Sequence, residues 1–200
     1  MTLAINKIIN SLLEIILFSL LPFLFWYFSA RKQESFRDWI GLNKIKGGKK
    51  TALAIILVTV FYLAISLVFL KGLNNIESAT SEFQGLGFAA LPAIFIYAVF
   101  NTSFPEEILF RGFILKRLAN KIGFTKANFI QGILFGLLHG VMFFPLVGNL
   151  KSILIILLTS LIALSMGYIN EKLSGGSIIP SWIIHAFSNL IAGLYAAFYI

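Results

Sequence analysis

Long apolar stretches alternate with short polar segments along almost the whole chain of 200 residues. Most of these stretches approach or exceed the roughly 20 residues that a helix needs to cross a bilayer. They are residues 8–28, 51–70, 88–118, 124–144, 152–170 and 178–200. The pattern predicts an all-α protein, a polytopic transmembrane helical bundle of about six spans.

One stretch, 88–118, allows two interpretations. The polar segment 101–107 interrupts it, and Pro105 removes a backbone donor there. The stretch could form two short helices that turn at Pro105, or one long helix that is kinked at this residue.

The distribution of basic residues favours one long span. A single span places the basic segments 31–50 and 116–126 on the same side, and together with Lys172 they hold twelve of the sixteen Lys and Arg residues. The positive-inside rule then puts this side in the cytoplasm and both termini outside. We therefore expect a long kinked helix over 88–118.

The first two spans and the basic loop between them form an N-terminal part, residues 1–87, ahead of a core at 88–200. Within the loop, Phe36, Trp39 and Ile40 follow each other at i, i+3 and i+4. This spacing suits a short helix in the membrane interface, although a solvated loop is the alternative.

Composition supports a membrane protein: 58% of the residues are hydrophobic and 12% are charged, against about 25% charged in a typical soluble domain. The absence of cysteine excludes disulfides, thiolate metal sites and a cysteine nucleophile. The formal charge of +8 is explained by the basic loops that orient the bundle, so we expect a lipid bilayer and no nucleic acid as partner.

Against this background, five ionisable residues inside the spans stand out: Glu106, Glu107, Arg111, His139 and His185. Each costs about 2.5–3.5 kcal/mol at the centre of a bilayer, so a functional interpretation is the default. The two histidines are the only ones in the chain.

Helical spacing suggests a task for each residue of the first motif. Glu107 and Arg111 are four residues apart and can form an ion pair, which we interpret as structural. Glu106 is then left without a cation about 100° around the helix. A buried carboxylate of this kind is a candidate general base.

The other two motifs each put two side chains on one helix face. Phe135 precedes His139 by one turn and can cover its ring, while Asn189 follows His185 by one turn. An imidazole and an amide can both donate hydrogen bonds to an oxyanion. Interhelical hydrogen bonding is the competing interpretation of both histidines.

At 1.5 Å per residue, the polar residues of the three motifs lie about 11–18 Å from the basic end of the bundle. They are Glu106, His139, His185 and Asn189. Such a set favours activation of water for attack on a peptide carbonyl. A metal-assisted hydrolase with Glu106, His139 and His185 as zinc ligands is the second possibility, although no H-E-x-x-H motif is present.

The three motifs, E-E-x-x-x-R at 106–111, F-x-x-x-H at 135–139 and H-x-x-x-N at 185–189, resemble those of the CAAX protease and bacteriocin-processing (CPBP, or Abi) family of intramembrane proteases. This family includes the type II CAAX prenyl endopeptidases and the lysostaphin-resistance-A-like bacterial proteins. The resemblance covers residues 88–200.

The resemblance implies an intramembrane endopeptidase. Glu106 would be the base, His139 would hold the water, His185 and Asn189 would stabilise the oxyanion, and Glu107, Arg111 and Phe135 would support them. Family members are described both as metalloproteases and as metal-free glutamate proteases. We favour the metal-free form without a cofactor.

The resemblance also implies a peptide or protein substrate, with or without a lipid modification, that reaches the site from the cytoplasmic half of the membrane. Composition suggests a bacterial plasma membrane protein, where the role would be peptide processing or bacteriocin self-immunity. Two alternatives are a proton-coupled transporter, since intramembrane Glu and His can relay protons, and a catalytically inert immunity protein.

Overall fold

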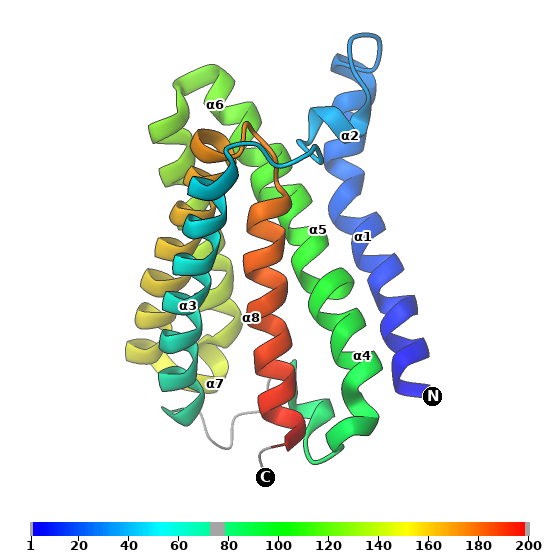
Figure 1. Ribbon diagram of the computed structural model, residues 1–200, viewed down its shortest axis with the longest axis vertical. Coiled ribbons are helices and arrows are strands. Elements are labelled where there is room, and N and C mark those ends of the chain that lie inside the picture. Colours follow the sequence, from blue (N-terminus) through cyan, green and yellow to red (C-terminus); the bar gives the residue numbers. More distant parts are fainter. Residues whose placement is uncertain (1, 73–78, 199–200) are drawn as a thin grey trace.

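The computed structural model describes residues 2–72 and 79–198. Within these residues, the chain forms helices that are joined by short loops (Figure 1). In lipid every backbone N–H and C=O must be paired internally, which an apolar helix achieves. Beside two short 3₁₀ turns, Ser81–Phe83 and Gly87–Ala90, the elements are α1 (Thr2–Ser29), α2 (Phe36–Trp39), α3 (Gly48–Gly72), α4 (Leu91–Ile96), η3 (Tyr97–Ser103), α5 (Phe104–Glu107), η4 (Ile108–Leu115), α6 (Lys116–Ile122), α7 (Phe124–Tyr168), η5 (Ile169–Leu173) and α8 (Ile179–Phe198).

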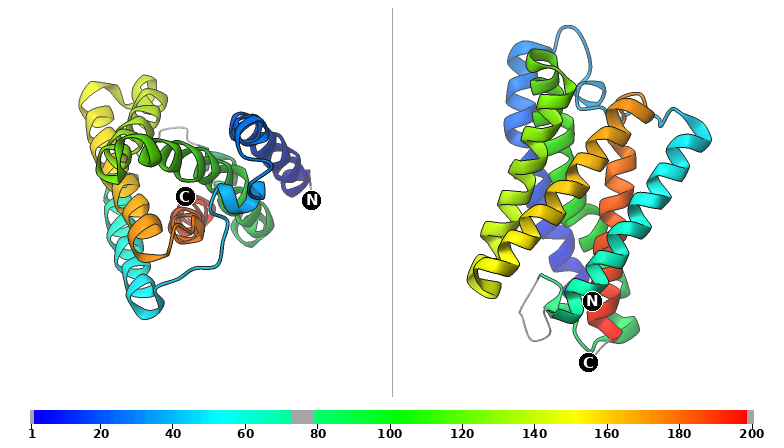
Figure 2. Two further views of the ribbon diagram at one scale, coloured as in Figure 1. Left: turned by 90° about the horizontal axis from the view of Figure 1, so that it is seen from above. Right: turned by 90° about the vertical axis from the view of Figure 1, so that its left-hand side faces the viewer.

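Five helical segments within the described residues are long and apolar enough to cross a membrane, which indicates an integral membrane protein and confirms the predicted helical bundle. The two stretches predicted at 124–144 and 152–170 are both limbs of α7. Gly148, with φ 73° and ψ −178°, breaks the helical path between them. The limbs run in opposite directions (Figure 2, right), so six apolar stretches still cross the bundle. The predicted end of the last stretch, residues 199–200, lies outside the described residues, as does part of the loop before residue 87.

The stretch around Pro105 forms one continuous helical segment from Gly87 to Ile122, as the charge distribution predicts. Its turns widen to π-helix in η3, before the proline, and again in η4. Pro105 has no N–H for the carbonyl four residues earlier. Within η3, the Ser103 hydroxyl donates to the carbonyl of Ala98, five residues back, at 2.6 Å.

The basic loops lie together at one end of the bundle, and both termini lie at the other end (Figure 1). The guanidinium of Arg117 donates to the carbonyl of Trp39 at 3.0 Å and stacks on its ring. Lys116 pairs with Glu171 at 2.7 Å. These contacts join the first basic loop, α6 and η5, so the predicted clustering of positive charge is confirmed.

The segment around Phe36 and Trp39, for which the sequence allowed an interfacial helix or a solvated loop, forms the short helix α2. Ser35 caps it by accepting a hydrogen bond from the backbone N–H of Asp38 at 3.1 Å. Trp39 and Ile40 are buried against Ile108 and Ile178. The helix therefore packs onto the end of the bundle.

A line of glycines on the first limb of α7, Gly132, Gly136 and Gly140, allows the two limbs to pack closely. A side chain on Gly136 would collide with Ser160, and one on Gly140 would collide with Ile156. Small residues four apart are the usual means of close helix packing in membranes. This glycine seam sets the position of Phe135 and His139, which lie on the same limb.

Candidate active site

Three helical segments bring the predicted residues together. Glu106 and Glu107 lie on α5 with Arg111 one turn later on η4, Phe135 and His139 lie on α7, and His185 and Asn189 lie on α8. The end view shows α8 near the centre of the bundle, next to the segment that carries α5 (Figure 2, left). Segments separated by up to 78 residues thus meet within the membrane.

Glu107 forms the buried centre of this group. Its Oε1 lies 3.1 Å from Nη1 of Arg111 and 3.1 Å from Nδ1 of His185. The side chains of Glu107 and Arg111 have no exposed surface. The predicted contact between Glu107 and Arg111 is confirmed, and the same carboxylate oxygen also contacts the imidazole of α8.

Arg111 is held on its other sides by α7. Its guanidinium lies 4.3 Å above the ring of Phe135, and Nη2 lies 3.7 Å from the sulfur of Met166. Removing one partner of a buried ion pair typically costs about 3–5 kcal/mol because the other charge is left uncompensated. Glu107, Arg111 and Phe135 are therefore in contact within the bundle.

Glu106 differs from its neighbour in having a free oxygen. Its side chain is 18% exposed, and Oε2 lies 3.9 Å from Nε2 of His185, which is too long for a hydrogen bond. This oxygen is buried and has no hydrogen-bond partner among the described residues. Glu106 thus has an unpaired acceptor next to an imidazole.

The ring of His139 is fixed by its own helix. Nδ1 lies 2.9 Å from the carbonyl oxygen of Phe135, and the two rings are 4.4 Å apart. A carbonyl only accepts, so Nδ1 must carry the proton, and in the neutral ring Nε2 is left as an acceptor. The ring of Phe135 also lies 6.0 Å from the ring of His185, so it contacts both imidazoles.

Asn189 is held by a residue that the motif analysis missed. Its Nδ2 donates to Oγ1 of Thr102 at 2.6 Å. Thr102 lies in the polar interruption before Pro105, and nothing in its spacing indicated a contact 87 residues away. Met166 was missed for a similar reason, since a methionine in an apolar helix carries no signal.

A further intramembrane carboxylate, Glu14 on α1, was also missed. Its side chain is half-buried on α1, which packs against the segments η3 and α5 that carry Asn101 and Glu106. The signal was present, because Glu14 is an acidic residue in the middle of the first apolar stretch, and the cost of intramembrane charge applies to it as it does to Glu106.

The alternative metal site is not assembled in this arrangement. Among residues 2–72 and 79–198, no three His, Asp or Glu side chains lie close enough together to hold a metal ion. His185 directs Nδ1 to Glu107, and His139 directs Nδ1 to a backbone carbonyl. The set Glu106, His139 and His185 does not fit a metal in this geometry.

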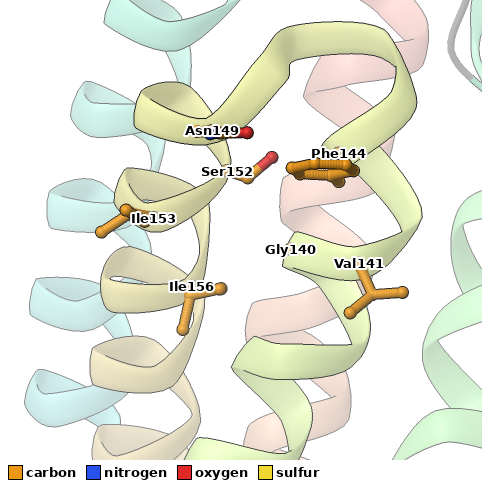
Figure 3. Close-up of a pocket in the computed structure, with 7 residues that line it drawn as sticks. All are labelled: Gly140, Val141, Phe144, Asn149, Ser152, Ile153 and Ile156. Carbon is orange, nitrogen blue, oxygen red and sulfur yellow. The ribbon is translucent and has the colours of Figure 1, made fainter.

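A pocket of about 480 Å³ opens between the two limbs of α7 (Figure 3). Most of its lining is apolar, and it includes none of the candidate site residues. Among the lining residues, Gly140 is the nearest in sequence to a candidate site residue, because it directly follows His139. The lining residues are Gly140, Val141, Phe144, Asn149, Ser152, Ile153 and Ile156.

The helical bundle defines a polytopic membrane protein, and a buried Glu–His group lies within it. The family model described as Type II CAAX prenyl endopeptidase Rce1-like matches residues 88–191, just over half of the chain. The chain belongs to this family, as its three motifs indicated, and membership implies a membrane endopeptidase with peptide substrates. Neither the curated proteins nor the solved structures contain a significant match to it.

Proposed function

We propose that the protein hydrolyses peptide bonds within the membrane by glutamate-activated water. The observation that carries this proposal is the unpaired Oε2 of Glu106 beside His185, together with a second imidazole, His139, whose ring contacts the same Phe135 as His185 does. Oε2 of Glu106 and Nε2 of His139 can each accept a hydrogen bond from the same water molecule. The water oxygen is then directed toward a substrate carbonyl.

In the first step, the water oxygen bonds to the carbonyl carbon while one of its protons passes to Glu106. His139 holds the water through the other proton, and its hydrogen bond to the Phe135 carbonyl maintains the required tautomer. The carbonyl π electrons move to oxygen and create an oxyanion.

His185 and Asn189 are the proposed donors to this oxyanion. Glu107 fixes the orientation of His185 through Nδ1, and in the imidazolium form both ring nitrogens donate, Nδ1 to Glu107 and Nε2 to the oxyanion. Thr102 accepts a hydrogen bond from one N–H of the Asn189 amide, and the second N–H remains free to donate to the oxyanion. Preorganised donors of this type contribute roughly 10²–10³-fold each in acyl transfer.

In the second step, the tetrahedral intermediate collapses. The C–N bond breaks, the carbonyl re-forms, and Glu106 returns its proton to the leaving amine. The negative charge that develops on the carbonyl oxygen stays within this group of residues. Glu107 and Arg111, which together carry no net charge, exclude water from it.

We also propose that the basic end faces the cytoplasm, because twelve of the sixteen Lys and Arg residues belong to the segments that form it. The substrate would then be a peptide or protein tail that enters from the cytoplasmic half of the membrane. Whether this tail carries a prenyl group is tested by offering prenylated and unmodified peptides side by side.

The test is cleavage of membrane-partitioning fluorogenic peptides by the protein reconstituted in liposomes. Glu106→Gln and His139→Phe should abolish cleavage, whereas Glu34→Gln, a matched change at an exposed carboxylate, should not. Cleavage that persists in Glu106→Gln removes the assigned base. Activity lost on chelation and restored by Zn²⁺ favours the metal mechanism, and Glu106-dependent proton flux without cleavage favours the transporter.

A further inference from the structure

A carboxylate that the mechanism above does not use lies inside the first span. Glu14 is on the partly buried face of α1, which also carries Lys7 and Ser11. At 1.5 Å per residue it lies about 18 Å along a helix about 42 Å long. A carboxylate at this depth points to a function and requires a partner.

The partner present, Asn101, does not neutralise it. Asn101 lies on η3, which packs against α1, and is 3% exposed. An amide carries no net charge. Its own oxygen, Oδ1, is buried and has no hydrogen-bond partner among the described residues, so this pair contains one buried acceptor that lacks a donor.

The cations in this part of the bundle have other partners. Lys7 forms an ion pair with Glu82 and lies 5.1 Å from the ring centre of Tyr97. It acts on Glu14 only from about two helical turns away. Arg111 is engaged by Glu107.

The nearest site residue adds to the negative charge. Glu106 lies on α5, which also packs against α1, and its Oε2 has no hydrogen-bond partner in the described part of the chain. A ligand that satisfies Glu14 and Asn101 must therefore bring both positive charge and N–H donors. An ammonium or guanidinium group has both properties.

The surroundings add an apolar requirement. A hollow of about 240 Å³ lies between α1 and η4, lined by Leu17, Phe18, Leu21 and Leu109. Leu17 follows Glu14 by about one helical turn, and Leu109 follows Glu106 by the same interval. The hollow thus begins about one helical turn from each carboxylate, and neither carboxylate is among its lining residues.

We propose that Glu14 and Asn101 form a subsite for a basic residue of the peptide substrate, with apolar substrate side chains in the hollow beside it. This inference rests on the proposed function and names the substrate class of that site. Glu106 keeps its task with the water, while the cation is held by Glu14 and the amide oxygen of Asn101.

The test uses a set of apolar fluorogenic peptides of one sequence in which each position carries Lys, norleucine or Glu in turn. Norleucine keeps the aliphatic chain of Lys and removes its charge. For at least one position, we expect wild type to show a KM about tenfold lower for Lys than for norleucine, which corresponds to about 1.4 kcal/mol. Glu14→Gln should remove this difference, mainly through KM, and Glu34→Gln should keep it.

Binding to an inactive protein separates this inference from the proposed function. Fluorescence anisotropy with Glu106→Gln should show the same preference for Lys, and the double variant with Glu14→Gln should lose it. If wild type cleaves none of the peptides, the proposed function fails, while the binding experiment still decides on the subsite. The subsite is disproved if Lys and norleucine peptides bind equally, or if the preference survives in Glu14→Gln.

Discussion

Oε1 of Glu107 lies 3.1 Å from Nδ1 of His185, and so joins the first and third motifs across 78 residues. The same oxygen contacts Arg111 at 3.1 Å. One carboxylate therefore compensates a buried guanidinium and orients the imidazole that we propose as an oxyanion donor. Its loss should affect both stability and catalysis.

Glu107→Gln should lower stability by about 3–5 kcal/mol, because Arg111 is left as a buried, unpaired charge. The double variant Glu107→Gln, Arg111→Met should regain much of this stability, since both charges are gone. Activity of the double variant should remain at least about tenfold below that of the wild type, because His185 has lost the carboxylate of Glu107 as its partner. Thermal unfolding in detergent and peptide cleavage measure the two effects. Full activity in the double variant would refute the orienting role.

Thr102→Val should reduce kcat about tenfold or more with a small effect on thermal stability. The substitution removes the acceptor that holds Asn189 at 2.6 Å and leaves the side chain almost unchanged in volume. Thr102→Ser keeps the hydroxyl and should retain most of the activity. Equal activity in the two variants would show that the contact does not position Asn189.

Gly136→Leu should prevent the two limbs of α7 from packing, because the side chain collides with Ser160. Overpacking of this kind typically costs about 1–3 kcal/mol, and it should displace His139 on the same limb. The measurement is the unfolding temperature together with cleavage. Leu137→Ala, a change at a neighbouring side chain that is 43% exposed, is the matched control and should have little effect.

The orientation of the bundle can be read by cysteine labelling, since the native chain contains no cysteine. Lys44 and Lys121 are exposed at the basic end, and Asn149 is exposed at the turn of α7. An impermeant thiol reagent should label Lys44→Cys and Lys121→Cys from one side and Asn149→Cys from the other. We expect the first side to be the cytoplasm, and labelling of Lys44→Cys from outside intact cells would reverse the proposed orientation.

The contacts that were predictable from sequence are those within one helix. The contact of Glu107 with Arg111 and the stacking of Phe135 on His139 follow from four-residue spacing. The single long span around Pro105 followed from loop charge, a rule that depends on residue counts and not on packing.

The contacts between helices were not predictable in this way. Spacing cannot show that Thr102 meets Asn189, or that Glu14 of the first span approaches Glu106, because these pairs depend on how the helices rotate against each other. That rotation depends on close packing between helices, as where Gly193 of α8 lies against Ile94 of α4, and such small or apolar residues carry no chemical signal of their own.

The sequence by itself determined that this protein is a helical membrane bundle, which end of it is basic, and which few polar residues the apolar background cannot explain. These properties follow from transfer free energies, which act residue by residue. The tertiary structure alone decided that Glu107 is shared by Arg111 and His185, that Glu106 keeps a free oxygen, and that Glu14 joins the same region. These relationships depend on contacts between distant segments, which only the packed helices create.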